Sequence, residues 1–516
     1  MRHSAAPRPK DWTPSMRGVY QRTPPLEFLK GTLMDTQARG AAADTRRRLG
    51  HPVIDMDGHI IEFMPAMMDF LKQVAGPEVS GRFWKGFLAQ NQRGWHQLGE
   101  TERRRANIYR PAFWLSPAEN TRDRATAMLP RLFRERLPEL GMDYSVIYPS
   151  IGLLLPSMAD DELRQASCRA YNVMVAELFR GCEDCLTAAA AIPCHTPQEA
   201  IAEMDYSLGE LGLKVPMVGS MVRRPIQTTD GRPLDTPRLL DHTFWVDLLA
   251  LDSEYDYDPL WQKCMDHKVP MTFHATTQGI GLRRSTSSYV YNQTGHFAEA
   301  GHAYAKALFF GGVTNRFPKL PFAFLECGAS WGAQMVHDLK ERWEKRSGDN
   351  LHRLDPRKID YDLMTKLFDK YGGERLAGRM SASTEAGRAE QPYVDEFAAA
   401  GISNIDDFYE RLIPNFYYGC EADDRLAATA FDPHYTPPGR KLRAMFSSDV
   451  GHWDVSDMDH VVPEAYEMVE EGIMTPEDFR DFMFGNPVRM LTSLNPDFFR
   501  GTNVESDVKA FLRADA

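Results

Sequence analysis

The residues best suited to do chemistry are a carboxylate and an imidazole that stand close together near position 57. Asp57 and His59 are two residues apart, so on an extended backbone both side chains point to one side and can reach one ion. His274 would add a second imidazole and Asp449 a second carboxylate. Such a mixed nitrogen and oxygen site suits Zn²⁺ first, with Mn²⁺ and Fe²⁺ as alternatives. The four residues predict a catalytic divalent metal. The alternative for the first pair is a capping aspartate beside a half-buried histidine.

For these residues to meet, distant parts of the chain must fold into one frame. Short apolar, β-branched or aromatic segments recur along the chain, separated by segments with helical periodicity. These segments are 53–57, 144–148, 186–192, 213–218, 269–274, 321–326, 415–421 and 444–449. Helical stretches between them include 159–182, 197–212 and 298–310. This alternation predicts a (β/α)₈ TIM barrel rather than an open sheet.

Polar residues stand where such a barrel builds its active site, at the carboxyl ends of the strands. Asp57, His274, Glu326 and Asp449 end the first, fifth, sixth and eighth segments. A buried strand end kept only for stability would carry valine or isoleucine instead. We therefore expect one shared site at the mouth of the barrel.

Four parts of the chain fall outside the regular alternation. Residues 60–143 and 340–412 are long insertions after strands one and six, expected on the active-site face as a lid or, equally, as a subunit interface. Residues 1–50 carry ten Lys or Arg against four Asp or Glu, a net charge of +6, and are predicted to form an arm around the body or a neighbouring subunit. The barrel is expected over 51–500, followed by a C-terminal tail over 501–516.

Composition excludes several classes of protein. The 516 residues include 60 Lys and Arg against 72 Asp and Glu, and a net charge of −12 does not suit non-specific nucleic-acid binding. The most apolar stretches, 146–156 and 186–193, are shorter than the roughly 18 residues that a membrane span requires. Seven cysteines, an odd number, and no apolar secretory segment at the start predict a cytoplasmic protein without membrane partners.

Four motifs occur in an order that is typical of one family. They are Ile54-Asp-Met-Asp-Gly-His-Ile-Ile-Glu62, residues 311–320 leading into 324–331, Ser447-Ser-Asp-Val-Gly-His-Trp-Asp454, and Phe484-Gly-Asn-Pro-Val-Arg489. Together they resemble the amidohydrolase superfamily, in the branch typified by aminocarboxymuconate semialdehyde decarboxylase. The resemblance implies a metal-dependent barrel that hydrolyses C–N, C–O or C–C bonds, or removes CO₂ from an aromatic or unsaturated acid. Glu62 is a further site candidate, or else caps the helix that follows it.

The same resemblance implies the ligands of the metal. Several decarboxylases of the family carry an acidic-x-His pair on strand one, which matches Asp57 and His59. The histidine of strand five carries over to His274 and the aspartate of strand eight to Asp449. By analogy with relatives, we also expect a homodimer.

One departure from the family pattern concerns proton transfer. Members often end strand six with a catalytic histidine, whereas this chain has Glu326, which could move protons or bind the ion. His296 and His302 lie just upstream and could supply the acid or base, or contact the substrate. We favour His296 for proton transfer because a glycine and a polar loop precede it, and a packed or surface imidazole is the alternative for His302. His452 could bind a substrate oxygen and Trp453 could form an apolar wall, or this loop could have only a structural role.

Three hypotheses about function follow. The first is a hydrolase, in which a divalent metal activates water, Asp449 or His296 takes its proton, and His296 or Glu326 returns it to the leaving group. The second is nonoxidative decarboxylation of an aromatic or muconate-type acid at the same site. The third, from a different class, is an inactive barrel that acts as a binding or scaffold protein. For both enzymes the expected partner is a small-molecule substrate.

Overall fold

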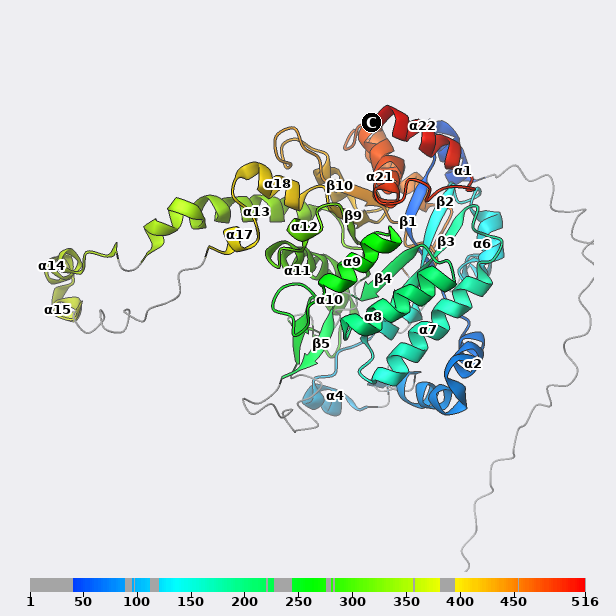
Figure 1. Cartoon of the computed structure of the whole chain (residues 1–516), viewed down its shortest axis with the longest axis horizontal. Helices are drawn as coiled ribbons and strands as arrows, with labels where there is room; N and C mark the ends of the chain where they lie inside the picture. The colour runs from blue at the N-terminus through cyan, green and yellow to red at the C-terminus, as the bar shows by residue number, and fades with distance from the viewer. Residues whose placement is uncertain are drawn as a thin grey trace, which may run out of the picture. The chain divides into compact units, whose positions relative to one another are not determined.

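In the computed structural model, eight parallel strands form one central sheet (Figure 1). They are β1 (Ile54–Ile60), β2 (Tyr144–Pro149), β3 (Leu186–Ile192), β4 (Val215–Gly219), β7 (Met271–His274), β8 (Phe322–Phe324), β9 (Phe416–Cys420) and β10 (Arg443–Phe446). Their spatial order follows their order along the chain. An antiparallel hairpin of β5 (Val222–Pro225) and β6 (Phe244–Asp247) forms a separate small sheet.

The first and last strands come together at their carboxyl ends. The amide of Asp449 donates to the carbonyl oxygen of Asp57 (2.8 Å), and the amide of His59 donates to that of Val450 (2.7 Å). Eight parallel strands in sequential order, drawn together in this way, confirm the predicted (β/α)₈ TIM barrel. The structure describes residues 40–88, 95–96, 98–111, 120–219, 221–226, 244–274, 280–281, 284–355, 358–380, 395–452 and 454–515.

All eight predicted segments overlap one of these strands, but some ends differ. β1 continues to Ile60 past an irregularity in its register between Asp55 and Gly58, so His59 belongs to the strand instead of following it. β8 and β10 end before Glu326 and Asp449, which therefore lie on the loops beyond them. Every residue of β1, β2, β3 and β9 is buried, as expected for parallel strands that helices enclose.

Helices follow the strands at the predicted places. The outer helices include α7 (Asp161–Leu178), α8 (Pro197–Met204), α9 (Asp258–His267), α11 (His296–Phe310), α13 (Ser330–Arg346), α19 (Val461–Glu470) and α21 (Asn486–Thr492). Local sequence explains their starts. Asp160 accepts a hydrogen bond from the amide of Leu163 at the beginning of α7, and Thr196 and Glu199 form a capping box before α8. Helices α7 and α8 pack on β3 (Figure 1).

The insertions are largely helical where the structure describes them. The first contains α2 (Met64–Phe83), α4 (Glu100–Ala106), α5 (Thr121–Thr126) and α6 (Pro130–Arg136), and the second α14 (Tyr361–Tyr371), α15 (Gly373–Leu376), α17 (Glu396–Ala399) and α18 (Ile405–Leu412). The first insertion reaches the loop after β7. The amide of Arg110 donates to the Ser285 carbonyl (2.8 Å), and the indole of Trp95 donates to that of Thr286 (3.1 Å). This part therefore lies on the carboxyl-end side of the barrel, and its role as lid or interface stays a prediction.

Parts of the predicted arm and tail are helical. Helix α1 (Ala41–Arg48) packs beside α19, and Arg46 pairs with Asp143 (2.5 Å). The predicted tail contains α22 (Glu505–Asp515), whose Asp515 pairs with Arg489 of α21 (2.6 Å). Among the described residues, no helix combines the length and apolar character needed to cross a membrane.

Candidate metal centre

His59, on β1, lies at the centre of a cluster of buried ionisable side chains. Its Nδ1 donates to the carbonyl oxygen of Pro149 (3.0 Å), which leaves the Nε2 lone pair for a ligand. Around this Nε2 lie Asp449 Oδ1 at 3.2 Å, His274 Nε2 at 3.2 Å and Asp57 Oδ1 at 3.4 Å. The four residues predicted to bind the metal thus meet around one atom, although they come from opposite ends of the barrel sequence.

Glu326 belongs to the same cluster. Its Oε2 lies 3.3 Å from His274 Nε2, and its side chain, like those of Asp57, His59, His274 and Asp449, is 0% exposed. Glu326 and Asp449 both have a positive φ, 52° and 53°. This left-handed conformation costs a non-glycine residue roughly 1–2 kcal/mol and persists only where the surroundings enforce it. In this protein the left-handed backbone directs the carboxylates of Glu326 and Asp449, from the loops after β8 and β10, toward the same site.

His452 completes the cluster on its outer side. Its ring stacks on that of His59, with centroids 4.4 Å apart and an angle of 15° between the planes. Its Nδ1 lies 3.1 and 3.2 Å from the two oxygens of Asp449 and 3.6 Å from Glu326 Oε1. Its side chain is 10% exposed, so it is the member of the cluster nearest to solvent. Although burial opposes the shift, the charges of Asp449 and Glu326 raise the pKa of His452 well above its ordinary value.

The carboxylates of the cluster lack the donors that buried acids normally have. From the described residues, both oxygens of Asp57, both of Glu326 and Oδ1 of Asp449 accept no hydrogen bond of good geometry. Burial, followed by the charges of Glu326 and Asp449, raises the pKa of Asp57, and burial likewise raises the pKa of Asp449. Buried charges without partners are costly, so this arrangement fits a site that holds a cation.

Two overlapping sets of side chains offer ligand atoms that all lie within 4.8 Å of one another. The first set is Asp57, His59, His274 and Glu326, and the second is His59, Glu326, Asp449 and His452. All the ligand atoms are carboxylate oxygens or imidazole nitrogens, which are the donors that first-row divalent metals accept. The residues present therefore fit a divalent cation.

His296 lies near this cluster but outside both sets. It begins α11, where its Nδ1 lies 2.6 Å from the carbonyl oxygen of Gln293. Its ring packs against Phe297 with centroids 3.7 Å apart, and the ring of Phe297 lies 6.3 Å from that of His274. Phe297 therefore contacts both His296 and a member of the centre.

His302 does not join the centre in the described part of the chain. His302 lies further along α11 and packs against Trp331, with ring centroids 5.8 Å apart, as the packed alternative proposed. Burial lowers its pKa. Trp453 lies outside the described residues.

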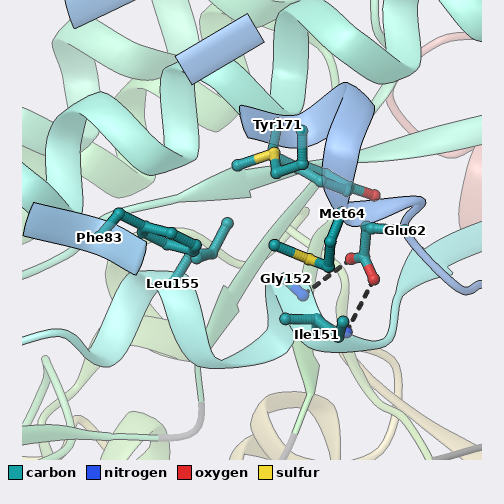
Figure 2. A pocket seen from close by; sticks show the side chains of 8 residues that line it. Glu62, Met64, Phe83, Ile151, Gly152, Leu155 and Tyr171 are labelled. Atoms are coloured by element: carbon teal, nitrogen blue, oxygen red, sulfur yellow. Dashed lines mark hydrogen bonds between the residues drawn. The ribbon is translucent and has the colours of Figure 1, made fainter. Parts of the chain in front are cut away.

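Glu62 has a structural position, but it does not cap α2, the helix that follows it and the one that the capping alternative concerned. Its two oxygens accept hydrogen bonds from the amides of Ile151 and Gly152, both at 2.8 Å, at the start of the helical turn η3 (Ile151–Ser157). Figure 2 shows these two bonds, with Phe83 and Tyr171 among the apolar neighbours. Glu62 thus links the end of β1 to the loop after β2.

Comparison with known proteins identifies the family of the chain. A model of the family described as Amidohydrolase (Amidohydro_2) matches residues 54–377, more than half of the chain. The chain belongs to the amidohydrolase family. The resemblance seen in the motifs is therefore confirmed, and with it the assignment as an enzyme.

Several solved structures are similar to this amidohydrolase. An amidohydrolase from Mycobacterium avium subsp. paratuberculosis K-10 is 16% identical with a TM-score of 0.48, over 86% of this chain and 100% of that one. A 2,6-dihydroxybenzoate decarboxylase from Rhizobium is 15% identical, with a TM-score of 0.42 over 86% and 99%. A dihydroxybenzoic acid decarboxylase from Polaromonas sp. JS666, with bound manganese and the inhibitor 2-nitroresorcinol, is 15% identical, with a TM-score of 0.45 over 86% and 97%. No curated protein sequence matches the chain.

Asp55 supports the amidohydrolase centre and was not predicted from the sequence. Its carboxylate accepts hydrogen bonds from Ser145 Oγ (2.6 Å), the amide of Ser448 (2.8 Å) and the amide of Asp57 (3.0 Å). It therefore joins β1 to β2 and to the loop after β10. The signal in the sequence is the alternation of Asp55, Asp57 and His59, three polar residues at every second position of an apolar strand.

Glu421 was also missed. It directly follows β9, and burial, followed by the charges of Asp449 and Glu326, raises its pKa well above the ordinary value. Glu421 is the last residue of the seventh predicted segment, so the criterion of a polar strand end could have found it.

Proposed function

We propose that this amidohydrolase-family protein is a metal-dependent carboxy-lyase, which removes CO₂ without oxidation from a small aromatic or unsaturated acid. The observation that carries the proposal is the position of His452, an imidazole held against the carboxylates of Asp449 and Glu326 at the outer side of the centre. A proton donor placed there is what decarboxylation requires, because the carbon that loses CO₂ must gain a proton.

The ion would be held by Asp57, His59, His274 and Asp449, with Glu326 as a fifth ligand. When bound, a divalent cation supplies a Lewis acid that polarises a carboxylate or hydroxyl oxygen of the substrate. Three carboxylates and two imidazoles form a donor set rich in oxygen. It suits Mn²⁺ better than the Zn²⁺ that the four sequence-predicted ligands favour.

The charge balance of the centre supports a protonated His452. Asp57, Glu326 and Asp449 bring three negative charges into a place where their side chains have no exposed surface. A single divalent cation leaves one of these charges uncompensated. An imidazolium at His452, in contact with two of the three carboxylates, would neutralise it. The resting centre would then hold an acid rather than a base.

The reaction needs one proton transfer and one bond cleavage. With Nδ1 of His452 held by Asp449, Nε2 remains to give a proton to the carbon that bears the carboxylate. The bond from this carbon to the carboxylate carbon then breaks, its electron pair stays on the ring or chain, and CO₂ leaves. Solvent returns the proton to His452, whose side chain is 10% exposed.

Hydrolysis is the second candidate, and Asp449 favours it. Its Oδ1 accepts no hydrogen bond of good geometry among the described residues and lies 3.2 Å from His59 Nε2, so it could take a proton from an attacking water. A metal-free scaffold is disfavoured, because five buried carboxylate oxygens without donors would destabilise a fold that binds no cation.

The test of the reaction class uses the purified chain loaded with Mn²⁺ in ¹⁸O-labelled water. The panel contains 2-hydroxybenzoate, 2,6-dihydroxybenzoate, 5-carboxyvanillate and a set of esters and amides. We expect CO₂ from at least one hydroxylated acid and no ¹⁸O in the organic product. Incorporation of ¹⁸O into an acid released from an ester or amide, without CO₂, would establish the hydrolase instead.

The role of His452 has its own test. In His452→Asn we expect kcat to fall by about 10²–10⁴-fold, the usual contribution of a positioned acid, while one equivalent of Mn²⁺ still binds. His434→Asn is the matched control, because His434 is 85% exposed and pairs only with Asp432 among the described residues. Loss of the metal from His452→Asn would make His452 a ligand. The expected homodimer stays a prediction that sedimentation of the full chain would check.

A further inference from the structure

We propose that Gly451 and Asp123 are positioning residues that hold His452 against the candidate metal centre. Gly451 lies in the turn between Asp449 and His452, and Asp123 lies on α5 of the first insertion. The inference rests on the proposed role of His452 as the proton donor. It gives part of the first insertion a function within the protomer, which is to support the loop that carries the donor.

Residues 449–452 form a β-turn whose first and last side chains both belong to the centre. The amide of His452 donates to the carbonyl oxygen of Asp449 (3.0 Å). This hydrogen bond brings the His452 ring back onto Asp449, where its Nδ1 lies 3.1 Å from Oδ1. Gly451 is the third residue of the turn and has a φ of 99°, which residues with a Cβ rarely adopt. The turn therefore depends on glycine at this position.

The turn also passes so close to β1 that no side chain fits at Gly451. A Cβ there would overlap the carbonyl oxygen of His59, and it would lie 3.1 Å from that carbonyl carbon and 3.3 Å from the Cβ of Ala127. The amide of His59 donates to the carbonyl oxygen of Val450 (2.7 Å), so strand and turn are joined at the same place. The main chain of a buried strand cannot move aside as the end of a side chain can. Gly451→Ala would therefore push the turn, with His452, away from His59.

The first insertion contacts the same loop. Ala127 directly follows α5 and is buried, and its carbonyl oxygen accepts a hydrogen bond from the amide of Ile61 (2.8 Å). Asp123 of α5 accepts a hydrogen bond from the amide of Met458, further along the loop after β10, at 3.3 Å. Its other oxygen pairs with Arg136 at 2.7 Å, and the two side chains are 1% and 5% exposed. The loop after β10 is thus attached both to β1 and to α5.

The first test measures each substitution with and without His452. In Gly451→Ala we expect kcat for CO₂ release to fall about 100-fold, because a displacement of about 1 Å is enough for such a loss, while one equivalent of Mn²⁺ still binds. In the His452→Asn background the same substitution should lower kcat by less than about twofold, since no acid is left to misplace. Asp123→Asn should show the same dependence on His452 with a smaller loss, about tenfold.

Gly472→Ala is the matched control for backbone strain. Gly472, after α19, also has a positive φ of 71°, but a Cβ there would meet no atom within 4 Å. This substitution therefore introduces the strain without the overlap. It should change kcat by less than about twofold.

A second test does not depend on the reaction. Diethyl pyrocarbonate modifies accessible imidazoles, and mass spectrometry of the Mn²⁺-loaded full chain gives its rate at His452 relative to His434. In the wild-type protein these two side chains are 10% and 85% exposed. Gly451→Ala and Asp123→Asn should raise the relative rate at His452, by up to about eightfold if His452 becomes as exposed as His434.

Three results would overturn the positioning role. They are a loss of kcat that is equal in both backgrounds, loss of the metal from Gly451→Ala, and an unchanged rate of modification at His452. The two proposals can also fail separately. If no acid releases CO₂ but both substitutions expose His452 to the reagent, only the proposed reaction is removed. If CO₂ release depends on His452 but not on Gly451 or Asp123, only the positioning is removed.

Discussion

Two groups of buried carboxylates near the end of β1 differ in what compensates their charge. Asp55 accepts three hydrogen bonds and Glu62 accepts two backbone hydrogen bonds. In contrast, Asp57, Glu326 and Asp449 together have five oxygens that accept no hydrogen bond of good geometry from any residue whose position the structure describes. All five side chains are buried, so burial does not distinguish the groups. The number of hydrogen-bond donors distinguishes them. Acids with donors stabilise the fold, whereas acids without donors form a site for a cation.

The largest effect should follow the removal of one acid that lacks donors. In Asp449→Asn the side chain keeps its shape but loses the charge that attracts the ion, so we expect kcat/KM to fall roughly 10³-fold or more, about 4 kcal/mol in transition-state stabilisation. Elemental analysis should show well below one equivalent of metal. After chelation, the free energy of unfolding should be unchanged or higher by about 1 kcal/mol, since two like charges are no longer buried together.

Urea unfolding of the chelated proteins tests whether Asp449 serves to bind the cation rather than to stabilise the fold. If metal-free Asp449→Asn unfolds several kcal/mol more easily than metal-free wild type, Asp449 is a structural acid, and the distinction by donors fails. Adding Mn²⁺ back to chelated wild type should restore activity, which separates loss of the ion from damage to the fold.

At Asp55 we expect the opposite, namely that a substitution lowers the stability of the metal-free fold. In Asp55→Asn the amide oxygen can keep the two backbone hydrogen bonds that Oδ1 accepts, while the NH₂ faces Ser145 Oγ and a charged acceptor is lost. We therefore expect the free energy of unfolding of the metal-free protein to fall by about 1–2 kcal/mol. Asp69→Asn, at an exposed position of α2, is the matched control and should change it by less than about 0.5 kcal/mol. A metal-free Asp55→Asn protein as stable as wild type would show that these three hydrogen bonds contribute little.

The sequence was sufficient to predict the barrel and most of the centre. Each strand is a buried apolar segment, and the carboxyl ends of parallel strands meet at one rim, so polar residues at those ends had to converge. The convergence of Asp57, His59, His274 and Asp449, and the presence of Glu326 beside them, follow from this rule.

What could not be predicted depends on loop conformation. The bulged continuation of β1 and the left-handed backbone at Glu326 and Asp449 have no periodic signal in the sequence. The same holds for the return of His452 onto Asp449, three residues earlier, which is a loop conformation. For that reason sequence reasoning placed the proton donor at His296, on a helix, whereas we now propose the loop residue His452. The β5–β6 hairpin was missed because it lies between two strands of the expected alternation.

The remaining effect concerns Glu62 and is seen only as a change of stability with pH. Burial raises the pKa of Glu62 to about 7, and its two backbone donors only partly oppose this. Between about pH 4.5 and 7 the folded chain therefore keeps a proton that the unfolded chain releases, so this group makes stability fall as the pH rises, by up to about 3 kcal/mol. Glu62→Gln cannot titrate and should lack this contribution. Urea unfolding at about pH 5 and pH 8 should thus give a smaller advantage of wild type over Glu62→Gln at the higher pH. A constant difference would mean that Glu62 is ionised throughout and that two backbone donors satisfy it as fully as three donors satisfy Asp55.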